Sequence, residues 1–263
     1  MGAEKLTPLE KDVTMALMYL RGLVSGLNNI LFPNVCLLCQ TFIPSQNPTP
    51  SLCLNCDNKI QENAPPFCLK CSRQLIITEN EDHTLCPECQ KHSYAFDSAW
   101  GICVYDETMR RLLHLFKYGQ KTSLRHYFKD RILSFLHTYH IDLSDYDRIV
   151  PIPLHSVRLR ERGYNQSELL AQTLAEQFHL TLCTNNFFRV KNTPYQARLT
   201  QKDRWTNIAG AFRIKQTFQF SNNKILLVDD LMTTGATVSE AARILKQAEA
   251  KRVDVLTLAI AGE

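Results

Sequence analysis

The stretch ILLVDDLMTTGAT, residues 225–237, decides the fold. Its first four residues are apolar and predict a buried strand, because a short apolar run of this kind is typical of a parallel sheet. Two acids, Asp229 and Asp230, end the run, and a turn of small residues then leads to a predicted helix over about 237–248. Ligands bind at the carboxyl ends of strands in open α/β sheets. The stretch therefore predicts a binding site together with the fold.

The turn after the acids has the composition of a phosphate-binding loop. It consists of Thr233, Thr234, Gly235, Ala236 and Thr237. Small residues and a glycine let backbone N–H groups close around a phosphate, and the helix N-terminus adds a favourable dipole. The acids can accept hydrogen bonds from the vicinal hydroxyls of a sugar, so the unit suits a sugar 5-phosphate. Neither a Walker A loop nor a dinucleotide fingerprint is present, and an ordinary strand–turn–helix has no use for two acids at this position.

Short apolar runs alternate with helical patterns through the rest of the C-terminal half. We expect strands at 98–105, at 147–150 and at 253–259, and helices at 107–118, 123–139 and 165–178. Such alternation implies a parallel sheet with helices on both faces. The predicted class is therefore α/β.

Eight of the ten cysteines form four C-x-x-C units, which are Cys36/Cys39, Cys53/Cys56, Cys68/Cys71 and Cys86/Cys89. Two such turns complete a tetrahedral shell of four sulfurs around zinc, and a closed shell makes the metal structural. Sequential pairing is the simplest, and the spacing also allows a cross-braced pairing of the first unit with the third. Redox dithiols are the competing interpretation, which four units without a flanking βαβ pattern disfavour. Cys103 and Cys183 lie outside these units and are predicted to be small buried hydrophobes.

Charge and hydropathy indicate where the protein works and what it attracts. The net charge is +4, but residues 110–210 hold 16 Lys/Arg against 8 Asp/Glu. This excess attracts phosphates of nucleotides or nucleic acids, although a solvated basic face has the same composition. No run of about 18 apolar residues and no export signal is present, so we expect a cytoplasmic protein without a transmembrane segment. An apolar stripe at 12–31 predicts a helix that docks on its own domain, or contacts a second copy, a partner or the inner face of the membrane.

Three segments carry a resemblance to a known family. Residues 225–237 look like the phosphoribosyl-diphosphate (PRPP) signature of type I phosphoribosyltransferases. VPIPLHSVRLRERGYNQSELLA at 150–171 and QARLTQKDRWTNIAGAF at 196–212 resemble segments of the ComF/GntX family. The resemblance covers roughly 33–262. It implies a double zinc-binding module at 33–95 and a type I phosphoribosyltransferase domain at 96–263. The apolar stripe predicts that residues 1–32 form a separate N-terminal amphipathic helix.

The resemblance also implies roles for particular residues. Asp229 and Asp230 would hold the ribose and Mg²⁺ of PRPP, and the turn 233–237 its 5-phosphate. The residues of the implied pyrophosphate loop are Pro153, Leu154, His155, Arg158, Arg160, Arg162, Gly163 and Asn165. Those of the implied flexible loop are Arg198, Lys202, Arg204 and Asn207. Lys117 and Tyr118 are weaker candidates for ligand contact. Close relatives can manage with the cysteines of one zinc, so one or two structural zinc ions are implied.

Two functions follow from this resemblance. The first is a ComF-like competence protein that binds PRPP and single-stranded DNA and works with other competence-machinery proteins during natural transformation. The second is an active phosphoribosyltransferase that transfers the phosphoribosyl group to a base or amine. Tyr164, Tyr195 and Trp205 lie near basic residues and could stack on bases, or could equally pack inside the protein.

Overall fold

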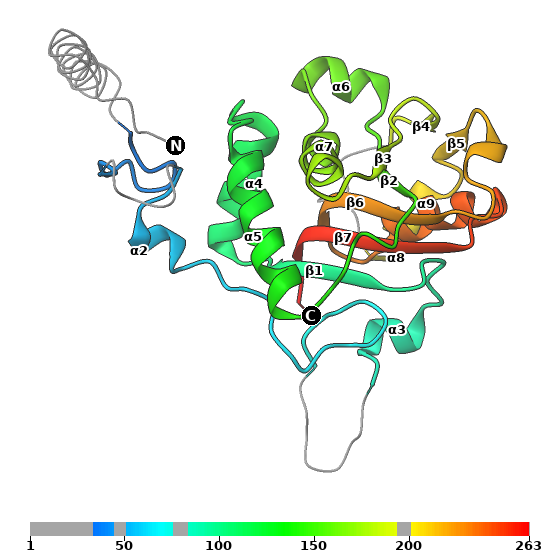
Figure 1. Cartoon of the computed structure of the whole chain (residues 1–263), viewed down its shortest axis with the longest axis horizontal. Helices are drawn as coiled ribbons and strands as arrows, with labels where there is room; N and C mark the ends of the chain where they lie inside the picture. The colour runs from blue at the N-terminus through cyan, green and yellow to red at the C-terminus, as the bar shows by residue number, and fades with distance from the viewer. Residues whose placement is uncertain (1–33, 45–50, 76–83, 194–200, 263) are drawn as a thin grey trace, which may run out of the picture. The chain divides into compact units, whose positions relative to one another are not determined.

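The computed structural model describes residues 34–44, 51–75, 84–193 and 201–262, with the side chains of 201–203 left out (Figure 1). The predicted helix at 12–31, Tyr195 and Arg198 lie outside these residues. The chain divides into two compact units, the first ending at Asn58 and the second spanning Lys59–Glu263. Each unit is described by itself.

Among the described elements, α2 (Leu54–Asp57) lies in the first unit and the others lie in the second. Its helices are α3 (Pro87–Lys91), α4 (Glu107–Tyr118), α5 (Leu124–Thr138), α6 (Ser156–Arg162), α7 (Gln166–Phe178), α8 (Gln201–Ile208), the 3₁₀ helix η2 (Thr217–Gln219) and α9 (Ala236–Gln247). Its strands are β1 (Ala99–Val104), β2 (Arg148–Pro151), β3 (Thr181–Leu182), β4 (Phe187–Arg189), β5 (Phe212–Ile214), β6 (Lys224–Met232) and β7 (Arg252–Ile260).

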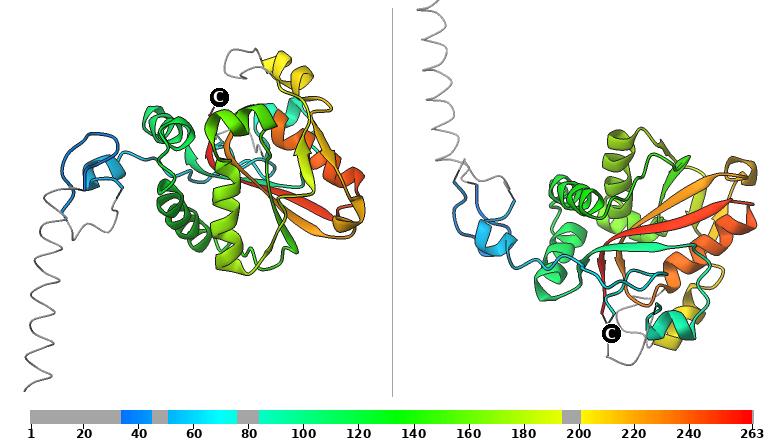
Figure 2. Two further views of the ribbon diagram at one scale, coloured as in Figure 1. Left: turned by 90° about the horizontal axis from the view of Figure 1, so that it is seen from above. Right: turned by 60° about the horizontal axis from the view of Figure 1, so that its bottom comes forward.

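In the described part of the chain, five strands form a parallel sheet in the order β1-β7-β6-β2-β3. The connection from β2 through α7 to β3 and the connection from β6 through α9 to β7 run in opposite directions along the sheet. Because such crossovers are right-handed, α7 and α9 must cover opposite faces. Figure 2 shows this arrangement, with the green helices on one side of the strands and orange α9 on the other. The predicted α/β fold with a parallel sheet is confirmed.

Strand β6 is longer than the sequence predicts. It pairs with β2 only as far as Pro151↔Val228, but with β7 as far as Met232↔Ile260. The acids therefore belong to the strand and extend past the end of β2, because β7 continues to hydrogen bond with β6 there. This end of β6 and β2 is the switch point from which the chain leaves in two directions, the place where open α/β sheets bind ligands.

The core of the second unit extends beyond the sheet and its helices. It includes Cys68, Cys71 and Cys86, which are at most 2% exposed, together with Tyr94 and Phe96. The second half of the predicted zinc-binding module is thus packed into the same core as α9 and β6. Cys103 and Cys183 are buried, as predicted.

No helix within the described residues is long and apolar enough to cross a membrane.

Candidate functional site

The acid pair of β6 is held by two side chains from neighbouring helices. Lys117 Nζ at the end of α4 lies 2.9 Å from Asp230 Oδ1, and Ser167 Oγ in α7 donates to Asp229 Oδ1 at 2.9 Å. Burial and the nearby Asp230 charge raise the pKa of Asp229 to about 7. Burial alone would lower the pKa of Lys117, but the Asp230 carboxylate outweighs burial and raises it. The site thus combines two carboxylates with one cation, a donor set that fits a Mg²⁺-bound diol.

Two carbonyl groups of the turn 233–237 accept hydrogen bonds from side chains earlier in the sequence. Tyr94 Oη donates to Thr234 O at 2.8 Å, and the Arg73 guanidinium donates to Thr233 O. Gly235 has φ +78° and is the N-cap of α9, so the 12-residue helix starts directly from the turn. With the carbonyls tied on one side, the arrangement suits an anion bound through the helix N-terminus.

The segment 151–165 contains a helix, α6, and is not a plain loop. His155 Nδ1 accepts a hydrogen bond from Val157 N at 3.3 Å and caps α6, which ends at Gly163 with φ +84°. Pro153 and Leu154 precede α6, and Arg160 is exposed on it. Asn165 Oδ1 accepts from Ser167 N and caps α7.

Two arginines of α6 point to different neighbours. Arg158 donates to Thr193 O, beside the β4–β5 hairpin. Arg162 donates to Gln166 Oε1 at 2.6 Å and to Tyr118 Oη at 3.1 Å, and its guanidinium lies 4.8 Å from the centre of the Tyr118 ring. The weaker candidates Lys117 and Tyr118 are therefore both tied to site residues, through Asp230 and Arg162.

The implied flexible loop is helical over α8. Arg204 in α8 donates to Thr233 Oγ1 at 3.1 Å, which brings this residue to the turn. Asn207 Nδ2 is buried and has no hydrogen-bond partner in the described residues. Lys202 lies in α8, with its side chain outside the description.

Two of the three aromatics considered as base-stacking platforms pack inside the protein. The Trp205 ring stacks on His92 with centroids 5.1 Å apart and lies 5.6 Å from Tyr94. Tyr164 Oη donates to Phe116 O at 2.6 Å. The packing interpretation of these residues is therefore the one the structure favours.

Sequence reasoning missed Arg189 at the end of β4. Its guanidinium donates to Thr193 Oγ1 at 2.6 Å, while its buried Nε has no hydrogen-bond partner in the described residues. Burial, and next the charge of Arg158, lower the pKa of Arg189 to about 10, against the opposing effect of Asp229. Two guanidinium groups thus meet at Thr193, and the charge of Asp229 acts on that of Arg189. An anionic ligand would stabilise this pair of cations. No motif in the sequence around β4 marks this residue.

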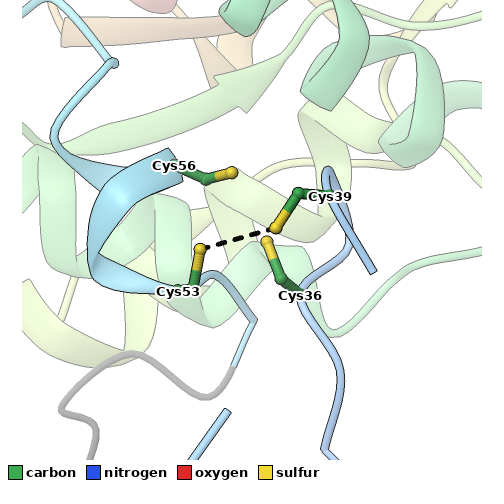
Figure 3. A group of neighbouring side chains, drawn as sticks. All are labelled: Cys36, Cys39, Cys53 and Cys56. Carbon is green, nitrogen blue, oxygen red and sulfur yellow. Dashed lines mark hydrogen bonds between the residues drawn. The ribbon is translucent and has the colours of Figure 1, made fainter. Parts of the chain in front are cut away.

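The first four-cysteine site lies in the first unit (Figure 3). Its ligands are Cys36, Cys39, Cys53 and Cys56, and their sulfurs all lie within 4.8 Å of one another. Zinc–sulfur bonds of about 2.3 Å in a tetrahedron place sulfurs about 3.8 Å apart, so this spacing fits zinc. Hydrogen bonding to the Thr41 side chain and backbone lowers the pKa of Cys39 to about 6, which favours the thiolate ligand.

The second four-cysteine site consists of Cys68, Cys71, Cys86 and Cys89, also within 4.8 Å. The two sites share one local design. Gln40 N donates to Cys36 O and Ser72 N donates to Cys68 O, and both Gln40 and Ser72 have positive φ. A short helix follows Cys53 in one site and Cys86 in the other. Of the two pairings that the spacing allows, the sequential one is therefore correct.

A separate cavity of about 250 Å³ lies beside Trp100 and Tyr146, near the amino ends of β6 and β7. Lys224 and Arg252 in its wall form ion pairs of 2.5 Å with Asp145 and Asp254. The cavity is thus at the opposite end of these strands from the acid pair, and its cations are already neutralised.

Comparison with known proteins gives the same two parts. The family model of a phosphoribosyl transferase domain matches residues 152–263, and that of a double zinc ribbon domain matches 27–90. Competence protein F of Haemophilus influenzae is 30% identical over 218 residues, which cover 79% of this chain and 90% of that protein. DNA utilization protein YhgH of Escherichia coli is 29% identical over 225 residues (80% and 96%). Competence protein ComFC of Bacillus subtilis is 27% identical over 240 residues (85% and 94%).

The sheet, the acid pair and the turn define a type I phosphoribosyltransferase fold, accompanied by two four-cysteine zinc-ribbon sites. With this similarity over most of its length, the chain belongs to the ComF/GntX family.

Proposed function

We propose that this protein binds PRPP with Mg²⁺ at the end of β6 and acts in the handling of single-stranded DNA during competence or DNA utilization. The observation that carries the PRPP part is the placement of Asp229, Asp230 and the turn 233–237 on one continuous segment at the switch point of the sheet. The names of the relatives support the role in DNA handling.

Each part of PRPP has a matching group in this site. The 5-phosphate suits the N-terminus of α9 and the Thr233 hydroxyl, and the ribose diol suits the two carboxylates. Arg158 and Arg189 lie where they could receive the diphosphate, and Arg204 adds a third guanidinium at the turn. Asp229 and Asp230 would hold Mg²⁺, which would supply neutralisation of the charge on the diphosphate.

Loss of the acid pair tests the PRPP site. The double variant Asp229→Asn/Asp230→Asn keeps the shape of both side chains but removes both charges. We expect PRPP affinity in the presence of Mg²⁺ to fall by roughly 100-fold or more in a calorimetric titration, because two charge-assisted contacts of about 1.5–3 kcal/mol each are lost. Asp130→Asn, at an exposed carboxylate of α5, is the matched control. Equal PRPP affinity in both variants would contradict the proposed site.

Binding of single strands is tested by fluorescence anisotropy of a labelled oligothymidine at several salt concentrations. A phosphate-tracking surface gives a linear fall of log affinity with log salt concentration. Adding saturating PRPP shows whether the two ligands share a surface.

Transformation of cells tests the link between PRPP and DNA handling. In a strain that lacks this protein, the acid-pair variant is expected to leave transformation impaired. Full restoration of transformation by this variant would oppose the link.

The alternative function is phosphoribosyl transfer to a base or amine. The specific observation in its favour is the meeting of Arg158 and Arg189 at Thr193, together with the contact of Arg204 with Thr233. These cations could stabilise a departing diphosphate. Pyrophosphate release from PRPP in the presence of candidate bases separates the functions: a binding protein releases none.

A further inference from the structure

Arg73 joins the second four-cysteine site to the carboxyl ends of two central strands. This arginine is 4% exposed and lies two residues after Cys71. Its NH1 donates to Cys71 Sγ at 3.5 Å, its Nε donates to Ala261 O at 3.1 Å, and its NH2 donates to Thr233 O. Ala261 directly follows β7, and Thr233 directly follows β6. One side chain therefore contacts a zinc-ligand sulfur, the end of β7 and the first residue of the phosphate turn.

Tyr94, which follows the second site in the chain, supports the next residues of the same turn. Its hydroxyl donates to Thr234 O at 2.8 Å. Its ring also closes the space behind Gly235, where an added Cβ would lie 2.6 Å from Tyr94 Cε1. The neighbouring Ala95 N donates to Ser239 Oγ in the second turn of α9 at 3.1 Å. The segment 94–95 thus fixes the turn and the start of α9 against the second site.

The second site is itself tied to strand β1. Ser72 Oγ accepts from Gly101 N at 2.8 Å, and Asn63 Nδ2 donates to both Ser72 O and Gly101 O. Lys70 O accepts from Ala99 N at 2.9 Å. Because the second site is anchored on β1 and Arg73 reaches β6 and β7, displacement of its sulfurs must move the guanidinium that holds Thr233.

We propose that the second four-cysteine site sets the geometry of the phosphate turn, with Arg73 as the positioning residue that couples the bound metal to the affinity for a sugar 5-phosphate. The inference rests on the proposed PRPP site and assigns a role in it to the second zinc alone. The first four-cysteine site, in the first compact unit, has no part in this coupling.

The test uses the full-length zinc-loaded protein and two variants that leave the zinc ligands intact. Arg73→Lys keeps the positive charge but cannot span three acceptors, because an ammonium lacks the fork of a guanidinium. Tyr94→Phe keeps the ring behind Gly235 and removes the hydroxyl, with its hydrogen bond to Thr234 O and its contact with the Arg73 side chain. Zinc content and thermal unfolding establish that each variant is folded and loaded.

Two small probes separate positioning of the turn from a general loss of structure. Ribose 5-phosphate reports on the turn, and inorganic pyrophosphate with Mg²⁺ reports on the neighbouring arginines. We expect Arg73→Lys to lower the affinity for ribose 5-phosphate by roughly 10-fold or more, the size of loss in activity that follows removal of the hydrogen-bonded partner of a metal ligand. The affinity for pyrophosphate should stay unchanged. The proposal is overturned if the variant and the wild type bind ribose 5-phosphate with equal affinity, or if the affinities for both probes fall equally.

Hydrogen exchange of the amides of 233–237, measured without any ligand, tests the coupling separately from PRPP binding. Exchange is expected to accelerate in Arg73→Lys and in Cys89→Ser, which removes a ligand of the second site. The matched variant Cys39→Ser removes a ligand of the first site and should leave the exchange rate of residues 233–237 unchanged. Unaltered exchange in Arg73→Lys overturns the coupling. Faster exchange in a protein that binds neither PRPP nor ribose 5-phosphate retains the coupling and overturns the proposed function instead.

Discussion

At the scale of single residues, Glu240 shows how a buried charge keeps the surroundings of the site in place. This carboxylate in α9 is 8% exposed and accepts from Gly210 N at 2.7 Å, just beyond the end of α8. The Arg243 guanidinium completes the shell with two hydrogen bonds of 2.7 and 2.8 Å. Burial alone would raise the pKa of Glu240, but these donors lower it overall.

We therefore expect Glu240→Gln to lower the free energy of unfolding by about 2 kcal/mol at pH 7, since hydrogen bonds to a charged group are lost. A carboxyl with a depressed folded-state pKa stabilises the protein above its unfolded pKa of about 4.3 and loses this effect as the pH falls through the folded-state value. The difference between variant and wild type should thus narrow below about pH 4 in urea unfolding curves. Glu176→Gln, at an exposed position of α7, is the control, and a difference independent of pH would argue against this account.

At the scale of elements, the β4–β5 hairpin carries Arg189 to the site. The antiparallel pairing places Arg189 opposite Phe212, and an isolated parallel bridge connects it to His155 at the start of α6. Its guanidinium also lies 5.7 Å from the centre of the Phe212 ring. The hairpin and α6 thus bring two arginines together from distant parts of the sequence.

Replacing Arg189 by Met is expected to weaken pyrophosphate and PRPP binding by roughly 10-fold or more, because a charge-assisted contact of about 1.5–3 kcal/mol is removed. Stability should not fall by the same amount, since the variant also removes a cation repelled by Arg158. Arg213→Met changes an exposed arginine of β5, on the same hairpin, and is the matched control. Equal pyrophosphate affinities of the two variants would exclude Arg189 from the diphosphate site.

The sequence predicts helices, strands and metal-binding turns well where a local pattern determines them. The strand 225–228, the helices after Asp106 and Asn165, and the four C-x-x-C units each have local determinants, namely apolar runs, caps and turn geometry. Helix α8 was missed, because Trp205 packs on His92 and Tyr94, more than a hundred residues earlier in the chain. The roles of Arg189 and Arg73 depend in the same way on contacts that no spacing in the sequence reveals.

At the scale of the whole molecule, the two zinc-ribbon sites belong to different compact units. The family resemblance groups them in one double zinc-binding module at 33–95. In the structure the second unit begins at Lys59, and three cysteines of the second site are part of its core. The second site is therefore expected to be as important for the stability of this unit as any of its helices.

Truncation tests this division. A chain starting at Lys59 should fold and carry one zinc per molecule, against two for the full chain, by the rule of four thiolates per metal. A chain starting at Phe96 lacks buried residues such as Cys68, Cys71 and Tyr94, and should be unfolded or lose most of its stability. Native mass spectrometry measures the zinc content of each chain, and circular dichroism measures its thermal unfolding. Cooperative unfolding of the shorter chain at the same temperature as the longer one would refute this division.

The order of the sheet also has a consequence for synthesis on the ribosome. Strand β7 lies between β1 and β6 but is made after the four other strands of this sheet, so Ala99 pairs only after Val255 has been made. At about 5–20 residues per second, this delay is roughly 10–30 s. Once β6 has also been made, β1 and β6 each have an edge without its partner until β7 follows. A chain that stops before residue 250 would leave both edges available for aggregation, because residues 252–260 complete the sheet.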